Sequence, residues 1–421
     1  MNKSFRSIWN ASKQAYVAAA ENVSACGKPS ASSQATLALS AVLSGLLSMS
    51  AHAQTAPPPS ALPTGAQVSA GQASIQSNGA AMRIQQSTDR AAINWQSFNV
   101  GSNAQVQFQQ PSSNSVTLNR VMSADPSQIF GRITANGQVI LTNPSGVYFS
   151  PSARVDVGGL VATTHSITDA NFMAGNHQFE RNGSTAAVVN QGSIKATGGY
   201  VALLGASVSN EGRIETNGGA ALLGAAETVK VPLGSSGRIK LELTPSAINA
   251  AVSNSKDGTI VTHGGQVYMQ AAALNTAVAS ILQSGSIDTT GEQGGAVHVL
   301  ADGGQIKVDG RITANSTGKD KQGQQRAGGD IYIGRDKGTN VLAAVGDASG
   351  ARLESEGGFV ETSGQYLKVD GVQVKAKDWL LDPYNITITS TSSGTAYSDP
   401  SSGDYTYTPS ATSSILASDI Q

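Results

Sequence analysis

The pattern of apolar positions changes at Gly65. From there, short alternating runs of apolar and polar residues are separated by Ser, Asn, Gly and Pro, which is typical of strands joined by turns. An amphipathic helix would show a period of about 3.6 residues over ten or more positions, and no such stretch follows residue 54. The pattern therefore predicts an all-β fold. The apolar positions of the first runs are Ile75, Ile84, Ile93, Val100, Val106, Phe108, Val116, Leu118 and Val121.

A repeated phrase indicates which all-β fold this is. Asn190–Leu203 reads NQGSIKATGGYVAL and Asn210–Leu223 reads NEGRIETNGGAALL. Looser copies begin at Asp257, Ser284, Asp309 and Arg352. In each copy an apolar residue precedes a Gly pair, at Ile194, Ile214, Ile260, Ile287, Ile312 and Leu353. A second apolar position follows the pair, at Val201, Ala221, Val267, Val297, Ile331 and Val360.

A unit this short has too little apolar surface to fold alone, whereas stacked copies bury one continuous core. We therefore predict a right-handed parallel β-helix with short extra-helical strands and an N-terminal cap. The Gly pairs are expected at the corners, because Gly reaches positive φ without strain and lets two backbones approach closely. The copies differ most in length between Asn315 and Ala327, which predicts a loop on one edge.

The first 53 residues form a targeting segment. Four basic residues precede an apolar run, Leu37–Met49, that is too short to span a bilayer. Small residues at Ala51 and Ala53 fit a signal-peptidase site, so we predict cleavage between Ala53 and Gln54. Residues 54–64 contain four prolines and are expected to form an extended leader.

Charge and cysteine content narrow the class of function. The targeting segment holds 4 of the 27 basic and 1 of the 28 acidic residues, so the exported part has a net charge of about −4. This balance argues against a nucleic-acid partner. The single cysteine, Cys26, lies in the targeting segment, so the exported part has no disulfide and is stabilised by packing and backbone hydrogen bonds.

Residues 94–164 resemble the haemagglutination-activity, or two-partner-secretion, domain of filamentous haemagglutinins and high-molecular-weight adhesins. The matching phrases occur in order: NWQSFNVG from Asn94, LNRV from Leu118, DPSQIFGRITANGQV from Asp125, NPSGV from Asn143 and VGGLVATT from Val157. The first 21 residues resemble the extended n-region of such exoproteins, and WLLDPYNITI from Trp379 resembles the passage into their shaft. The family usually has a second Asn where this chain has Ser145, and its phrase NPNL is absent upstream.

The resemblance implies a route of export and a layout. A signal peptide at 1–53, a leader at 54–64, a secretion domain at 65–310 and the start of a β-helical shaft at 311–421 are expected. The Sec machinery would carry the chain across the inner membrane. An outer-membrane β-barrel transporter with POTRA domains would then recognise the secretion domain and pass the unfolded chain to the cell surface or the medium. Ser414–Gln421 resembles the start of another coil, so we expect the chain to be a piece of a longer protein.

The turn Asn143-Pro144-Ser145-Gly146 is the candidate site. Asn at the first position, Pro at the second and Gly at the fourth fit a type I turn. We favour a folding corner over direct recognition of the transporter.

No catalytic, cofactor or metal site is predicted. Asp302, Asp309 and Asp330 adjoin glycines and are typical of turns, although Asp336 lies nearby and parallel β-helices also host pectin-cleaving and other glycan-cleaving enzymes. The histidines at 165, 177, 263 and 298 lack metal-ligand spacing, so we expect them at solvated or strand-surface positions.

The sequence therefore favours a non-enzymatic, adhesin-type exoprotein that binds a host or cell-surface ligand which the sequence does not identify. The alternatives are the delivery stalk of a contact-dependent toxin and, less favoured, a polysaccharide hydrolase or lyase.

Overall fold

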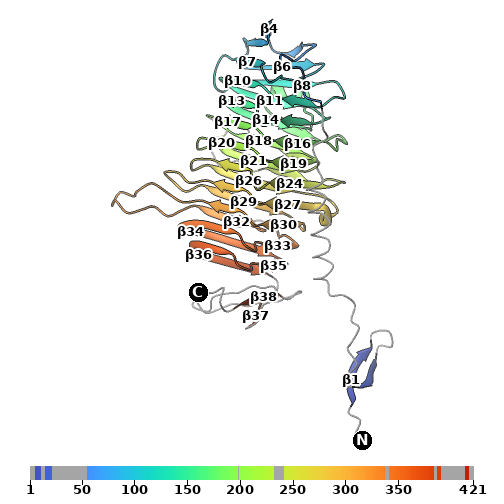
Figure 1. The fold of residues 1–421 in the computed structure, drawn as a ribbon, viewed down its shortest axis with the longest axis vertical. Coiled ribbons are helices and arrows are strands. Elements are labelled where there is room, and N and C mark those ends of the chain that lie inside the picture. Colours follow the sequence, from blue (N-terminus) through green and yellow to red (C-terminus); the bar gives the residue numbers. More distant parts are fainter. Residues whose placement is uncertain are drawn as a thin grey trace. The chain divides into compact units, whose positions relative to one another are not determined.

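The computed structural model describes residues 55–197, 199–231, 241–336 and 341–383, together with the backbone of four short strands outside these ranges. In the described part, successive coils of the chain stack into a rod whose equivalent strands pair in parallel (Figure 1). The predicted parallel β-helix is confirmed. Each complete coil contributes one strand to each of three faces of the rod.

The first and second faces belong to one continuous sheet. The first face contains β5 (Ala81–Gln86), β7 (Gln105–Gln109), β10 (Arg132–Ala135), β13 (Arg154–Val157), β17 (Ser193–Ala196), β20 (Arg213–Thr216), β25 (Thr259–Val261), β28 (Ser286–Asp288) and β31 (Arg311–Thr313). The second contains β6 (Arg90–Trp95), β8 (Val116–Val121), β11 (Gln138–Thr142), β14 (Gly159–Thr163), β18 (Val201–Gly205), β21 (Ala220–Ala225), β26 (Gln266–Ala271), β29 (Ala296–Ala301) and β32 (Asp330–Ile333). Both faces continue into the long strands β34 (Arg352–Gly364) and β36 (Gln373–Pro383).

The third face is a separate parallel sheet. Its strands are β9 (Ser127–Ile129), β12 (Val147–Phe149), β16 (Ala187–Asn190), β19 (Ser207–Asn210), β24 (Ala250–Asn254), β27 (Ala279–Gln283), β30 (Gln305–Val308), β33 (Val345–Asp347) and β35 (Tyr366–Lys368).

The remaining elements cap or decorate the rod. At the N-terminal end β3 (Gln67–Ala70) and β4 (Ala73–Asn78) pair antiparallel with β6 and β5. An extra-helical sheet of three antiparallel strands is formed by β15 (Gln178–Glu180), β22 (Thr228–Lys230) and β23 (Glu242–Thr244). The helices are α2 (Asp169–Ala174) and the 3₁₀ turn η1 (Thr276–Val278), and no described helix has the length and apolarity of a membrane span.

Four strands lie outside the continuously described ranges. β1 (Phe5–Asn10) and β2 (Ala15–Ala20) form an antiparallel hairpin in a separate unit, Met1–Ala41. β37 (Ile386–Thr389) pairs in parallel with β38 (Ser413–Leu416).

The register of the coils follows the repeat in the sequence. Ile194 pairs with Ile214, and the same column continues through Ile260, Ile287, Ile312 and Leu353. On the second face Val201 pairs with Ala221, and that column continues through Val267, Val297, Ile331 and Val360. These side chains are completely buried or nearly so and form the spine of the main core. The predicted stacking is therefore confirmed residue by residue.

The glycine pairs are required by close approach of the backbone as well as by turn geometry. A Cβ atom on Gly219 would lie 1.5 Å from the carbonyl oxygen of Gly199 in the preceding coil. At the same corner, a Cβ on Gly265 would lie 1.8 Å from the carbonyl oxygen of Gly219. Gly218 and Gly264, the first residues of their pairs, have φ of +70° and +86°, which L side chains rarely adopt. The second position of the pair therefore has no room for a side chain, and the first has a backbone conformation that disfavours one.

A ladder of buried amides runs along the end of the third face. Asn190 Nδ2 donates to Asn210 Oδ1 (2.8 Å), Asn210 Nδ2 to Asn254 Oδ1 (2.7 Å) and Asn254 Nδ2 to Gln283 Oε1 (2.8 Å). All four side chains are fully buried. The ladder satisfies polar groups inside the rod and ties four successive coils together. We did not predict it.

A second apolar core lies on the outer side of the second face. Residues that alternate with the interior positions, among them Ile140, Val161 and Leu222, pack against Phe172 of α2 and Phe179 and Val229 of the extra-helical sheet. The outward-facing side of these strands is therefore covered rather than solvated. α2 and the extra-helical sheet are held to the rod by this cluster.

Candidate functional site

The candidate turn lies between β11 on the second face and β12 on the third. Gly146 N donates to Asn143 O (3.0 Å), which closes the four-residue turn, and Ser145 N donates to Asn143 Oδ1 (2.9 Å). Gly146 has a φ of +121°, a conformation that favours glycine. Pro144 is exposed and Ser145 half-buried. The predicted turn is present, with the Asn side chain as a local acceptor.

Asn143 also connects three segments of the fold. Its side chain is fully buried, and Nδ2 donates to Asp125 O (2.9 Å) and Ser127 Oγ (3.0 Å) of the preceding coil. Its backbone N donates to Thr163 O (2.9 Å) of the following coil. The phrases beginning at Asp125, Asn143 and Val157 therefore meet at one amide. Ser145 contributes its backbone N–H to the turn, which explains why Ser is accepted where the family usually has Asn.

The carbonyl group of Pro144 receives a bond from outside the turn. Ser184 Oγ donates to Pro144 O (2.6 Å). Arg181, which is buried, donates through Nε to Ser184 O and through Nη1 to Ser246 Oγ, and Nη1 lies 3.8 Å from Glu227 Oε2. The turn is thus linked through Ser184 and Arg181 to segments that flank the extra-helical sheet.

The first two phrases of the resemblance also lie side by side, because β6 pairs with β8. Trp95 Nε1 donates to Asn119 Oδ1 (3.0 Å), and both side chains are buried. Arg120 Nη1 donates to Asn94 Oδ1 (2.9 Å), while its Nη2 donates to Asp169 Oδ1 (2.7 Å) at the start of α2. The polar residues of the motifs therefore bond to one another. The sequence showed these phrases but not their pairing.

Two histidines, His165 and His177, are buried next to α2 and the extra-helical sheet, contrary to our expectation of solvated or strand-surface positions. His165 is completely buried, with Nε2 2.9 Å from Ala226 O, and His177 is 5% exposed. Burial, assisted by Arg181, lowers the pKa of His165 to about 4. Burial and the nearby Arg90 lower the pKa of His177 to about 4. The expectation was wrong because the outer faces of the strands are covered. His298 is also buried, while His263 is exposed as predicted.

The four carboxylates considered for catalysis have separate local partners. Asp302 Oδ1 accepts from Leu342 N (3.2 Å), and Asp309 Oδ1 accepts from Ser284 Oγ (2.5 Å). Asp330 Oδ2 accepts from the Tyr332 hydroxyl (3.2 Å), and Asp336 lies 3.2 Å from His298 Nδ1. Among the described residues no three His, Cys, Asp or Glu side chains are grouped as metal ligands. The predicted cleavage site, Ala53 and Gln54, lies outside the described residues.

Comparison with known protein families identifies two regions of the chain. Residues 60–249 match the family described as TPS secretion domain, and residues 1–50 match the Extended Signal Peptide of Type V secretion system. The crystal structure of the HMW1 secretion domain from Haemophilus influenzae superposes with a TM-score of 0.61 at 28% identity. That match covers 76% of this chain and 100% of the other.

Two curated relatives are described as heme/hemopexin-binding proteins of Haemophilus influenzae. One is 36% identical over 51% of this chain, and the other is 40% identical over 26%. The aligned part makes up 23% of the first relative's length and 12% of the second's.

The stacked coils and the bonded motif residues, Trp95, Asn119 and Asn143, define a β-helical secretion domain. The chain carries the extended signal peptide and the TPS secretion domain of two-partner-secretion exoproteins, and these indicate export through the periplasm and outer membrane to a secreted or surface-associated location. Its TPS domain implies a cognate outer-membrane transporter. The matching domains and relatives are secretion domains and heme/hemopexin-binding proteins rather than enzymes.

Proposed function

We propose that the motif residues serve the folding of the secretion domain during export, and that Asn143–Gly146 is a folding corner. The observation that carries this proposal is the burial of Asn143, Asn119 and Trp95, whose polar atoms bond to neighbouring coils. Side chains engaged in this way are inaccessible on the folded surface. Contact between them and the transporter would require the unfolded chain.

In this proposal the Sec machinery delivers an unfolded chain to the periplasm, where the POTRA domains of the transporter bind it. Folding then starts outside the cell from the capped N-terminal coils, because each later coil needs a preceding coil to pair with. With Cys26 inside the targeting segment, no disulfide in the exported part would block passage through the barrel. We propose residues 65–310 as the secretion domain and 311–421 as the beginning of the shaft.

We further propose that the exported protein is an adhesin-type binding protein without enzymatic activity. Asp302, Asp309, Asp330 and Asp336 are each engaged by a different local partner, which supports this proposal, because a glycosidase uses two carboxyl groups about 5–9.5 Å apart that act on one bond. The heme/hemopexin-binding relatives make heme or hemopexin one candidate target. A toxin-delivery stalk remains the alternative, since the same domain would export either product.

The test combines Asn143→Ala with Pro144→Ala. The double variant removes the hydrogen bonds of the Asn143 side chain and the fixed φ of Pro144, at a cost of about 1–3 kcal/mol or more of folding free energy. Ser145→Ala is the matched control, because only the backbone N–H of Ser145 is used in the turn. We expect the double variant to lower both the extracellular yield and the thermal midpoint measured by circular dichroism, and the control to change neither.

Two outcomes would overturn the folding role. One is unchanged secretion with unchanged thermal stability in the double variant. The other is lost secretion with an intact, equally stable fold, which would indicate direct recognition of the turn by the transporter.

A further inference from the structure

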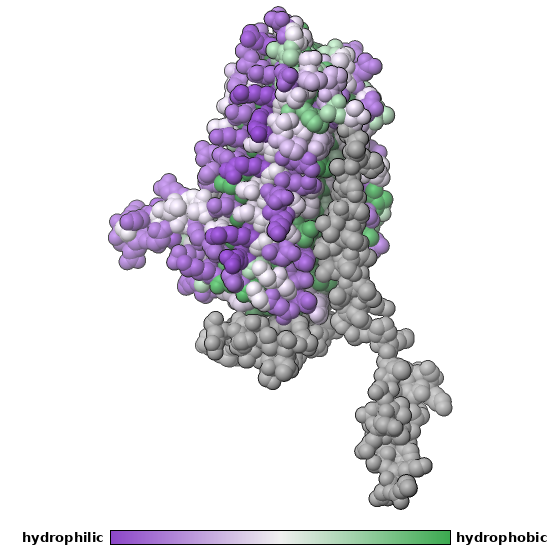
Figure 2. Space-filling model, viewed as in Figure 1, coloured by the Kyte–Doolittle hydropathy of each residue, from purple (hydrophilic) through white to green (hydrophobic). Residues whose placement is uncertain are grey.

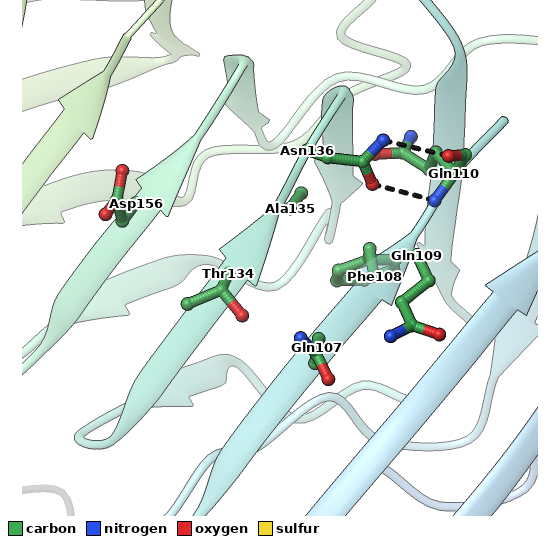
Figure 3. Close-up of a pocket in the computed structure, with 8 residues that line it drawn as sticks. All are labelled: Gln107, Phe108, Gln109, Gln110, Thr134, Ala135, Asn136 and Asp156. Atoms are coloured by element: carbon green, nitrogen blue, oxygen red, sulfur yellow. Dashed lines mark hydrogen bonds between the residues drawn. The ribbon is translucent and has the colours of Figure 1, made fainter. Parts of the chain in front are cut away.

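A shallow groove crosses the first face of the rod over three consecutive coils (Figure 3). It has a volume of about 540 Å³ and lies on β7, β10 and β13. Gln107 pairs in register with Thr134, and Thr134 with Asp156, so these three residues form one column on the outer side of the face. Gln109, two residues along β7, lies on the same side.

The side chains of the groove have unused hydrogen-bonding capacity. Among the described residues, no hydrogen bond or ion pair engages the side chain of Gln107, Gln109 or Asp156. Thr134 Oγ1 is enclosed by its surroundings and also has no partner. The amides of Gln107 and Gln109 and the carboxylate of Asp156 are therefore available to a ligand, whereas the Thr134 hydroxyl is enclosed.

The backbone at one end of the groove is held firmly. Asn136 Nδ2 donates to Gln110 O and Gln110 N donates to Asn136 Oδ1, both at 2.8 Å (Figure 3). The Gln110 side chain is buried, donates to Gln138 O (2.9 Å) and accepts from Gly137 N (2.9 Å). A groove on such a frame is pre-organised, so a ligand would order few protein groups on binding.

Two exposed arginines lie beside the groove, on a face that Figure 2 shows as mainly hydrophilic. Arg132 pairs in register with Arg154, and each lies two residues before a groove residue on the same side of its strand. Neither forms an ion pair within the described residues, whereas Arg213 and Arg311, farther along the face, are paired with Glu215 (2.9 Å) and Glu354 (2.8 Å). Arg154 Nη1 donates to the carbonyl oxygens of Pro151 (3.0 Å) and Ala153 (2.8 Å), so its Nε and Nη2 are the groups that would meet a ligand. Neighbouring like charges are unfavourable, so a ligand anion at Arg132 and Arg154 would be stabilised.

We propose that this groove binds an acidic oligosaccharide, whose carboxylates pair with Arg132 and Arg154 and whose hydroxyls bond to Gln107, Gln109 and Asp156. The guanidinium group matches a carboxylate in a two-point contact, and amide and carboxylate groups are suitable partners for sugar hydroxyls. Arg132 and Thr134 belong to the phrase that begins at Asp125, but neither side chain takes part in the bonds made by Asn143, Asn119 and Trp95.

The geometry favours a sugar chain over other polyanions. Strands of adjacent coils lie roughly 4.8 Å apart, which is close to the length of one pyranose residue, so successive sugars of an extended chain would meet successive coils. Asp156 lies within the groove as a hydrogen-bond acceptor for hydroxyl groups, which a polyphosphate or a polyglutamate chain does not offer. A sugar with hydroxyls beside its carboxylate would use Asp156 as an acceptor.

The experiment measures binding of fluorescently labelled tetragalacturonate to the exported chain by fluorescence anisotropy at low ionic strength. We expect saturable binding that unlabelled tetragalacturonate displaces and uncharged maltotetraose does not. The Arg132→Gln/Arg154→Gln variant should bind more than about tenfold more weakly, because both charge-assisted contacts are lost. Arg311→Gln, on the same face but paired with Glu354, is the matched control and should bind as the unchanged protein does.

A second probe, polyglutamate, separates sugar recognition from attraction to any anion. Asp156→Ala should weaken tetragalacturonate binding and leave polyglutamate binding unchanged or stronger. Failure of the unchanged chain to bind tetragalacturonate would overturn the proposal. Equal affinity for polyglutamate, or an equal loss of binding in the Arg311→Gln control, would overturn it as well. All of these variants alter exposed side chains, and unchanged thermal midpoints would confirm that the fold is intact.

Discussion

Acid should loosen the extra-helical sheet before it unfolds the rod. His165 and His177 are neutral when buried, and their pKa is lowered from 6.5 to about 4. Between these two values the unfolded chain binds more protons than the folded chain, so stability falls as the pH falls through this window. Each shift corresponds to about 3 kcal/mol when fully expressed below pH 4.

The loss of stability is expected where the extra-helical sheet attaches to the rod. His165 Nε2 lies against Ala226 O, two residues before β22, and His177 O accepts from Val231 N, one residue after it. Protonation would put positive charge near Arg181 and Arg90, which face the two rings. Glu227 lies 3.8 Å from Arg181, and the sheet itself carries Glu180 and Glu242. We therefore expect β15, β22 and β23 to detach while the coils remain paired.

Hydrogen exchange with mass spectrometry measures this directly. Protection of backbone amides in the extra-helical sheet, corrected for the intrinsic pH dependence of exchange, should drop between pH 7 and about pH 4.5. His165→Gln with His177→Gln should flatten the pH response, and His263→Gln, which changes an exposed histidine, should not. The reasoning is refuted if protection is unchanged at acid pH, or if the double variant responds as the unchanged chain does.

The pKa values of two glutamates, Glu215 and Glu361, are also shifted, and each changes the dependence of stability on pH in a different way. The hydrogen bond from Arg213, together with the charges of Arg213 and Lys195, lowers the pKa of Glu215 from 4.5, so its contribution to stability is present above about pH 4.5 and is lost as the pH falls further. Burial raises the pKa of Glu361, so its effect has the opposite sign and favours the folded chain at low pH. Neither residue lies in the extra-helical sheet, which is why exchange in that sheet isolates the histidines.

Two further predictions concern the rod itself. Asn210→Ala removes a side chain that both donates and accepts in the amide ladder, and it should cost about 2–5 kcal/mol in urea unfolding because two buried amides lose a partner; an unchanged midpoint would count against a stabilising ladder. Gly219→Ala should abolish folding or lower the thermal midpoint sharply, since the new Cβ would lie 1.5 Å from a carbonyl oxygen. Gly159→Ala, where the nearest contact would be 3.4 Å, is its control and should fold normally.

The repeat predicted the stacked columns because each copy keeps the same order of apolar residue, Gly pair and second apolar residue. It did not reveal the amide ladder, although Asn190, Asn210 and Gln283 each precede the repeat's isoleucine by four positions. At the third coil, two extra residues separate Asn254 from Ile260, which breaks the spacing in the sequence but not the alignment in the structure. A short insertion between coils therefore hid a regular feature.

The extra-helical sheet and its buried histidines could not be placed from local patterns. Its strands have three residues each, and Phe179 pairs with Val229, fifty positions away in the chain. The alternation along the second face correctly indicates which residues point outward, but not that α2 and this sheet cover them. The candidate turn could be predicted from the sequence because Asn, Pro and Gly favour a turn through their own local conformations. Its hydrogen bonds to Asp125 and Ser184 could not be predicted, because they depend on how the coils stack.

The amide ladder gives the rod a chemical direction. In each of its three side-chain contacts the earlier coil supplies the N–H donor and the later coil supplies the oxygen acceptor. A coil that has just formed therefore presents an unused donor at its advancing edge, and a strand arriving out of register leaves that donor unsatisfied inside the rod. Addition of a coil then resembles accretion on a crystal face, where the finished layer selects the alignment of the next.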